Sequence, residues 1–242
     1  MPEEYLLRIE DVDVHYGDFL AVQNVSMKFQ KGLITAVIGA NGAGKSTLLN
    51  AVMGLTPPSK GHIYFKDQEI TKMRTSLIVR RGITMSPEGS EVFEGMSIRE
   101  NLLMGAYTPA PRKKRAELMD KVYQLFPVLK EKEKQLATFL SGGQRQMLAI
   151  ARAIMSDPEL IICDEISLGL APVVIGDIYE KLHEINKAGM TVVLVDQEVH
   201  RSLEHSHYSY VMVKGGVVME GPSGELPEDE VKDAYFGINK YA

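Results

Sequence analysis

The segment from Leu33 to Thr47 constrains the fold more than any other part of this 242-residue chain. Residues 33–38 form a continuous apolar and β-branched run, as expected of a strand buried on both faces. Three glycines follow within residues 39–44, and residues 46–53 have the pattern of a helix that ends at Gly54. A buried strand, a glycine-rich loop and a helix in succession predict an α/β fold with parallel strands.

The rest of the chain divides by pattern into an α/β core and a helical stretch. Short strands are expected at 6–9, 12–15 and 25–29, and buried strands at 160–163 and 190–195. Residues 89–155 differ, because a capping box at Ser97–Glu100 and charged amphipathic patterns at 112–126 and 141–155 predict helices. We therefore expect one domain, with 1–88 and 156–242 forming the core and 89–155 a helical subdomain.

Composition excludes several classes of protein. The formal net charge of −5 does not suggest a general polyanion-binding protein, and a single cysteine, Cys163, rules out a disulfide within the chain. The N-terminus lacks the pattern of a secretory signal, and no apolar stretch approaches the ~20 residues that span a bilayer. If the protein acts at a membrane, a partner is expected to hold it there.

The loop after the first buried strand matches the pattern G-x-x-x-x-G-K-[ST], which binds nucleotide phosphates. Its glycines let backbone N–H groups turn inward toward phosphate oxygens, and the helix N-terminus adds partial positive charge. Lys45 is expected to reach the β- and γ-phosphates, and the Ser46 hydroxyl to ligate Mg²⁺. The predicted ATP-binding residues of this loop are Gly39, Ala40, Asn41, Gly42, Ala43, Gly44, Lys45, Ser46 and Thr47.

Two acidic residues, Asp164 and Glu165, come directly after the buried strand at 160–163. A buried strand that ends in two carboxylates needs a partner for their charge, and Mg²⁺ would supply it. We expect Asp164 to be an outer ligand of the metal and Glu165 to orient the attacking water. Taken alone, the two acids could equally be hydrated side chains at a strand end, and the upstream phosphate loop favours the catalytic interpretation.

A second anion-binding helix start is predicted at Leu140-Ser141-Gly142-Gly143-Gln144. Ser141 is a good N-cap, and the two glycines would let a ligand approach the backbone. One triphosphate already has a binding loop in this chain, so a second such site suggests the phosphate of a partner subunit.

These three motifs, in this order, resemble the ATPases of the ABC transporter family over essentially the whole chain. The resemblance implies a P-loop NTPase core with a mostly parallel sheet, an antiparallel β subdomain and an inserted helical subdomain. It also implies a head-to-tail dimer in which Leu140–Gln144 closes over ATP bound to the other subunit. Tyr16 would stack on adenine, with packing on the core as the alternative.

The chain departs from the common family pattern at three positions. Glu88 stands where the family usually has a glutamine that touches Mg²⁺ or water, and Gln197 stands where it usually has a histidine. Ile166 replaces a common proline. The first two departures, with residues 167–172 and 231–237, resemble the shorter ATP-binding subunit of branched-chain amino-acid importers, although Ile166 is unusual even there.

The resulting hypothesis is an ATP-hydrolysing subunit that drives solute import through a separate permease. Its cofactors would be ATP and Mg²⁺, and its catalytic residues Glu165, Lys45, Gln197 and Glu88. Its partners would be a second ATPase subunit, an integral membrane permease and, indirectly, a solute-binding protein. No nucleic acid is expected as a partner. The subunit would lie in the cytoplasm, peripheral on the inner face of the membrane. A urea or amide importer, an exporter, and a non-transport ABC protein are the alternatives.

Overall fold

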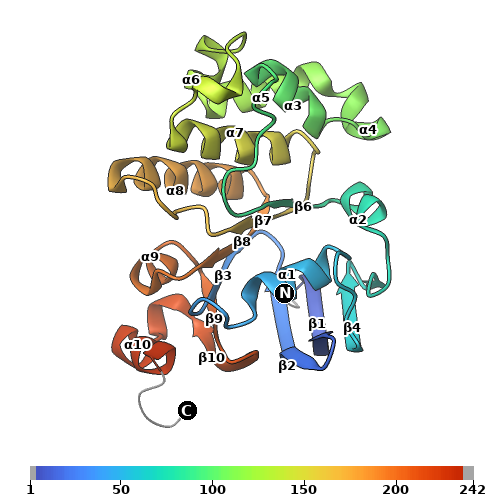
Figure 1. Ribbon diagram of the computed structural model, residues 1–242, viewed down its shortest axis with the longest axis vertical. Coiled ribbons are helices and arrows are strands. Elements are labelled where there is room, and N and C mark those ends of the chain that lie inside the picture. The colour runs from blue at the N-terminus through green and yellow to red at the C-terminus, as the bar shows by residue number, and fades with distance from the viewer. Residues whose placement is uncertain (1–3, 237–242) are drawn as a thin grey trace. The chain divides into compact units, whose positions relative to one another are not determined.

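The computed structural model describes residues 4–236, and the chain divides into two compact units (Figure 1). The first unit combines residues 1–78 with 191–242, and the second contains residues 79–190. The predicted helical subdomain, 89–155, lies entirely within the second unit, which also includes one strand before it and a strand and a helix after it. The predicted domain boundaries themselves remain a prediction.

The first unit contains an antiparallel sheet built from the start of the chain. Its strand order is β2 (Phe19–Gln30), β1 (Tyr5–Tyr16), β4 (Lys60–Phe65) and β5 (Gln68–Glu69). The two short strands expected at 6–9 and 12–15 are in fact one twelve-residue strand, β1. Its pairing with β2 shifts register between Ile9 and Val12, and Asp11 has φ of 50°. Such a bulge breaks the alternation of buried and exposed residues that the sequence pattern relies on.

The same unit also contains the strand that leads into the phosphate loop. β3 (Ile34–Ile38) pairs in parallel with β8 (Thr191–Asp196) and with β9 (Tyr208–Val213), and β9 forms an antiparallel hairpin with β10 (Gly216–Pro222). All five residues of β3 are buried, as its apolar sequence predicts. Helices α9 (Val199–Glu204) and α10 (Glu228–Phe236) cover this hairpin side (Figure 1). Their contact residues Val199 and Val231 join Ala36, Ile38 and Val211 in one buried cluster.

The second unit has two parallel strands and most of the helices. β6 (Ile83–Ser86) pairs with β7 (Leu160–Asp164), so the carboxyl ends of both strands lie at one edge. Helix α7 (Gly142–Ile154) is central, because α3, α5, α6 and α8 all contact it (Figure 1). These helices are α3 (Ile98–Gly105), α5 (Arg115–Leu125), α6 (Pro127–Glu131) and α8 (Pro172–Lys187). The capping box predicted at Ser97–Glu100 is confirmed, since Glu100 N–H donates to Ser97 Oγ and Ser97 N–H donates to Glu100 Oε2.

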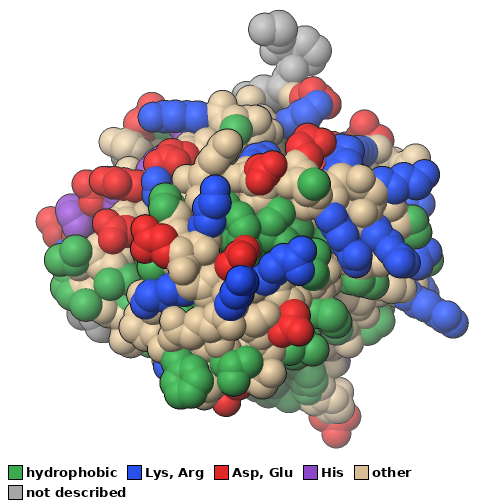
Figure 2. Space-filling view, turned by 90° about the horizontal axis from the view of Figure 1, so that it is seen from above, with side chains coloured by type: hydrophobic (Ala, Val, Ile, Leu, Met, Phe, Trp, Pro, Cys, Tyr) green, Lys and Arg blue, Asp and Glu red, His purple; other side chains and the backbone are tan. Residues whose placement is uncertain are grey.

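The helix expected at 112–126 is interrupted. The structure has α4 (Pro109–Lys113) and α5 instead, separated by Lys114, whose φ of −99° and ψ of 12° depart from helical values. Lys114 Nζ forms an ion pair with Asp157 at 2.7 Å. Figure 2 shows the molecule from above the view of Figure 1, with Lys and Arg side chains gathered toward the right and Asp and Glu more frequent toward the left. Within the basic run 112–115, Lys114 is thus paired with an acidic side chain.

The remaining helices are short. α1 (Lys45–Val52) follows the phosphate loop, and α2 (Thr75–Arg81) is a helix that the sequence did not predict. Single 3₁₀ turns occur at Ala137–Phe139 and Ser223–Glu225. Within residues 4–236, every helix is too short or too polar to cross a membrane.

Candidate functional site

The predicted phosphate loop joins β3 to α1 in a tight turn. Gly42 and Gly44 have φ of 80° and 99°, which favour glycine over any residue with a Cβ. A Cβ on Gly39 would lie 2.5 Å from the carbonyl oxygen of Met212, and one on Gly44 would lie 2.7 Å from that of Ala21. Backbone packing within the first unit therefore requires glycine at these positions. The same close contacts fix the curvature of the loop.

Lys45 is folded back into this loop. Its side chain is buried, and Nζ donates hydrogen bonds to the carbonyl oxygens of Gly39 at 2.7 Å and Ala40 at 3.2 Å. The backbone N–H groups of Gly42, Gly44 and Ser46 donate no hydrogen bond within residues 4–236. A concave loop with unengaged N–H donors and a cation at its centre is suited to binding a phosphate chain.

Gln197 lies beside the start of the phosphate loop. Because β3 and β8 are parallel and Ile38 pairs with Asp196, the residues that follow them, Gly39 and Gln197, leave the sheet at the same edge. Gln197 is partly exposed. Its position beside the loop is compatible with contact to a phosphate, which is the predicted role.

The sequence interpretation missed Asp196. Its side chain is buried at the end of β8, and Oδ1 accepts hydrogen bonds from the N–H groups of Gln197 at 2.7 Å and Glu198 at 3.1 Å. These bonds fix the turn that carries Gln197. The signal was present, since Asp196 follows a buried strand just as Asp164 does, but no motif pointed to it.

Tyr16 ends β1 at the hairpin and is half exposed. It pairs with Phe19, which is also exposed, so the two rings lie at one surface turn. Packing on the core, the alternative role for Tyr16, does not fit this exposure. Stacking on adenine remains a prediction.

The second unit contains the paired carboxylates. Asp164 and Glu165 are both buried, 6% exposed each, at the end of β7. Glu165 has φ of 45°, a left-handed conformation that costs a residue with a side chain on the order of 1–3 kcal/mol. Ser86 ends the neighbouring strand β6 opposite Cys163, and its buried hydroxyl has no hydrogen-bond partner within the described residues. Both strand ends therefore direct polar groups to one edge.

Glu88 follows β6 by two residues and is exposed. The turn after it contains two left-handed residues, Gly89 with φ of 82° and Ser90 with φ of 52°. Because β6 and β7 are parallel, Glu88 leaves the strands at the same edge as Asp164. Its carboxylate makes no hydrogen bond or ion pair within residues 4–236, so it is available to a ligand or to water.

The motif at Leu140–Gln144 begins α7 as predicted. Ser141 is the N-cap, with its Oγ accepting from Gln144 N–H at 3.3 Å, and Gln144 Oε1 accepts from Ser141 N–H at 3.3 Å. Gly143 also has a packing role, because a Cβ there would lie 2.3 Å from Cγ1 of Val174 on α8, and its predicted contact with a ligand stays a prediction. This glycine allows close helix packing, whereas Gly142 has open space apart from a 3.4 Å contact with Leu170.

Two other reactive side chains do not belong to the site. Burial raises the pKa of the Cys163 thiol to about 12, so it stays protonated and acts as an apolar residue of β7. His200 is exposed on α9, and Nδ1 lies 3.0 Å from Glu228 of α10, which raises the pKa of the imidazole. It is a surface residue and does not substitute for the histidine that Gln197 replaces.

Comparison with known proteins places these motifs in a family. Residues 22–167 match the family model described as ABC transporter. The chain is 41% identical over 233 residues to the high-affinity branched-chain amino acid transport ATP-binding protein BraG of Pseudomonas aeruginosa, covering 96% of this chain and all of BraG. It is 33% identical to the probable branched-chain amino acid transport ATP-binding protein LivF of Archaeoglobus fulgidus, covering 93% and 95% of the two chains.

Solved structures agree with this result. The ADP conformation of an ATP-binding cassette of an ABC transporter superimposes with a TM-score of 0.81 at 29% identity, covering 96% of this chain and 95% of that one. CbiO1 of Clostridium perfringens, part of a transporter complex, gives 0.83 at 25% identity over 98% and 96%. The predicted α/β fold with its antiparallel sheet and helical part is confirmed, and the chain belongs to the ABC transporter family as an ATP-binding subunit that hydrolyses ATP.

Proposed function

We propose that this ATPase drives the import of branched-chain amino acids. The observation that carries the proposal is the 41% identity to BraG across nearly the full length of both chains. The 33% identity to LivF, which is also named for branched-chain amino acid transport, supports the same solute class. The lipopolysaccharide export ATP-binding protein LptB of Escherichia coli is also related, at 30% identity, which keeps an exporter among the outcomes of a test.

We further propose that Mg²⁺ accompanies ATP. The Ser46 hydroxyl at the start of α1 and the carboxylate of Asp164 are oxygen ligands of the type that Mg²⁺ prefers. The unpartnered buried hydroxyl of Ser86 fits an edge that receives polar groups from outside the chain, such as metal-bound water. Mg²⁺ would supply positive charge to the phosphates, while Glu165 would orient the attacking water.

Within this proposal, the residues that bind and hydrolyse ATP have separate tasks. The phosphate loop and Lys45 hold the triphosphate, and Gln197 donates a hydrogen bond to it. Glu88 contacts the metal or the water with a carboxylate in place of an amide. The N-terminus of α7, presented by Ser141, contacts the ATP of a second subunit.

The partner that holds this subunit at the membrane is proposed to be a permease. The second unit has an apolar groove of about 430 Å³ lined by β6, α3 and α7. The large apolar side chains Phe93, Met104 and Tyr107 line this groove and are exposed, and Arg152 packs 5.0 Å from the centre of the Phe93 ring. Exposed apolar side chains gathered at one groove are typical of a protein interface. A short amphipathic segment of the permease would fill it and place the ATPase on the inner face of the membrane.

An uptake assay tests the transport function. We expect cells lacking this subunit to lose high-affinity uptake of labelled leucine and to regain it with the native chain but not with Glu165→Gln. Labelled urea serves as the matched control solute. Normal leucine uptake in the deletion strain, with loss of urea uptake or of an export activity, would refute the proposed solute class.

A further inference from the structure

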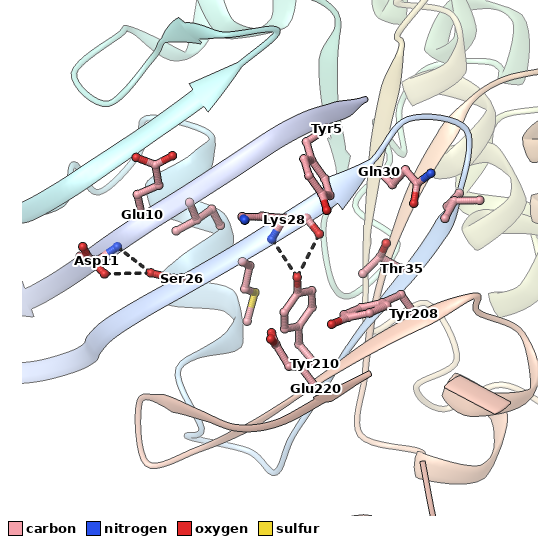
Figure 3. A pocket seen from close by; sticks show the side chains of 13 residues that line it. Tyr5, Glu10, Asp11, Ser26, Lys28, Gln30, Thr35, Tyr208, Tyr210 and Glu220 are labelled. Carbon is pink, nitrogen blue, oxygen red and sulfur yellow. Dashed lines mark hydrogen bonds between the residues drawn. The ribbon is translucent and has the colours of Figure 1, made fainter. Parts of the chain in front are cut away.

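The first unit contains a second cavity that the ATPase chemistry does not use. It has a volume of about 640 Å³, within the range of small-molecule sites, and lies between β1 and β2 on one side and β3, β9 and β10 on the other (Figure 3). None of its lining residues belongs to the motifs described above. It is therefore distinct from the nucleotide site.

Polar groups on its wall lack partners inside the protein. Thr35 is 1% exposed, yet its hydroxyl makes no hydrogen bond within residues 4–236. The side-chain amide of Gln30, on the same wall, makes none either. Buried polar groups in native proteins are normally paired, so an unpaired hydroxyl facing a cavity indicates that the cavity takes a polar ligand or water.

Three tyrosines, Tyr5, Tyr208 and Tyr210, supply aromatic surface to the same cavity. The rings of Tyr208 and Tyr210 lie 5.2 Å apart, and Nζ of Lys28 lies 5.4 Å from the centre of the Tyr5 ring. Tyr210 is fixed in place, because its hydroxyl accepts from Lys28 N–H at 2.8 Å and donates to the Lys28 carbonyl at 3.0 Å (Figure 3). The Tyr210 ring is therefore a fixed aromatic face at the cavity, and such a face can attract a cationic group.

The charges around the cavity differ in whether they are already paired. Glu10 pairs with Arg8, and Asp11 accepts a hydrogen bond from Ser26. Glu220, opposite Tyr210 on β10, has no ion pair or hydrogen bond among the described residues. Burial, with a smaller contribution from the negative charge of Glu220, raises the pKa of Tyr210, so its phenol stays neutral. Glu220 is thus the carboxylate available to a cationic group.

We propose that this cavity binds a small aliphatic molecule carrying a primary ammonium group. The ammonium would pair with Glu220 against the tyrosine faces, and Thr35 and Gln30 would supply hydrogen bonds. The aliphatic part would contact Ile9, Met27 and Leu33, which also line the cavity. Two sources share this chemistry, a free amine and an α-amino acid.

The position of the cavity relative to the phosphate loop makes the proposal testable. Thr35 lies near the start of β3, and the loop begins at Gly39 just after the other end of that strand. Ligand and nucleotide should therefore bind at the same time. This property distinguishes the cavity from a low-affinity contact with the nucleotide site.

The experiment is calorimetric titration of the full chain in phosphate buffer free of Tris, run in parallel with and without MgADP. The probes are 3-methylbutylamine, leucine and 4-methylpentanoate, which share an aliphatic part and differ in charge. We expect the amine to bind, and binding of leucine in addition would identify an amino acid as the natural class. Glu220→Gln should weaken binding by about tenfold or more, since it removes a charge-assisted hydrogen bond.

Two further variants test whether binding takes place in this cavity. Glu225→Gln changes an exposed carboxylate outside the cavity and should bind as the native chain does. Thr35→Val removes the unpaired hydroxyl with little change of shape and should also weaken binding. The proposal is overturned if neither amine binds, if 4-methylpentanoate binds equally well, if Glu220→Gln leaves affinity unchanged, or if MgADP abolishes binding.

Discussion

Glu165 is the residue whose backbone and burial most clearly set it apart. It is buried directly after β7 and has a left-handed backbone conformation with φ of 45°. Residues with a side chain rarely adopt this conformation unless the surrounding structure enforces it. The turn therefore fixes the carboxylate at the strand end, where a proposed water-orienting residue must be held rigidly.

Replacing Glu165 by Gln tests this role. The amide keeps the shape of the side chain but cannot accept a proton from water, so turnover should fall by about tenfold or more while ATP binding persists. Steady-state phosphate release and a nucleotide-binding titration measure the two quantities. Glu180→Gln, on the exposed face of α8, is the matched control and should hydrolyse ATP normally. Native turnover in Glu165→Gln would exclude the proposed role.

At the scale of elements, α7 depends on glycine for its packing. Gly143 lies against Val174 of α8 so closely that a Cβ would come within 2.3 Å of a methyl group. Valine is β-branched and stiff at χ1, so it cannot easily rotate away. The glycine that the sequence assigned to ligand approach thus also sets the distance between two helices.

Gly143→Ala should lower the free energy of unfolding by about 1–3 kcal/mol, the usual cost of overpacking. Gly142→Ala is the control, since its Cβ would meet only an ordinary 3.4 Å contact. Urea denaturation of the three proteins measures the effect, and adding Val174→Ala to Gly143→Ala should restore part of the loss. Equal stability of the two alanine variants would contradict the packing argument.

At the scale of the whole molecule, the predicted site residues are divided between the two compact units. The phosphate loop, Tyr16 and Gln197 belong to the first unit, while Asp164, Glu165, Glu88 and the start of α7 belong to the second. ATP binding to the phosphate loop of the first unit should stabilise the folded chain against unfolding, because the unfolded chain has no such loop.

ATP at about 100 times its Kd should add about 2.7 kcal/mol, which raises Tm by about 5–10 °C for a chain of this length. Lys45→Ala should lose most of this shift because the phosphates lose their cation. Lys121→Ala, on an exposed face of α5, should keep it. Thermal unfolding with and without MgATP provides the measurement, and an undiminished shift in Lys45→Ala would count against the assigned role.

The sequence was sufficient wherever the information was local. The buried strand, loop and helix at 33–53 and the N-cap at Ser141 were predictable because periodicity, glycine spacing and capping depend on residues a few positions apart. The same rules failed at β1, where a bulge interrupts the alternation, and at Lys114, where one predicted helix divides.

Tertiary structure alone decided the rest. Asp196 supports the turn beside the phosphate loop because β8 pairs with β3, and Gly143 is needed because α8 packs on α7. The Tyr210 hydroxyl accepts a hydrogen bond from Lys28 N–H, although the two residues are 182 positions apart in the sequence. Both residues line a cavity with Thr35 and Glu220, and no sequence motif predicts this cavity. The sequence by itself determined an ATP-binding loop and its family, because those patterns are contiguous. Contacts between distant segments leave no periodic signal, so only the folded chain could reveal them.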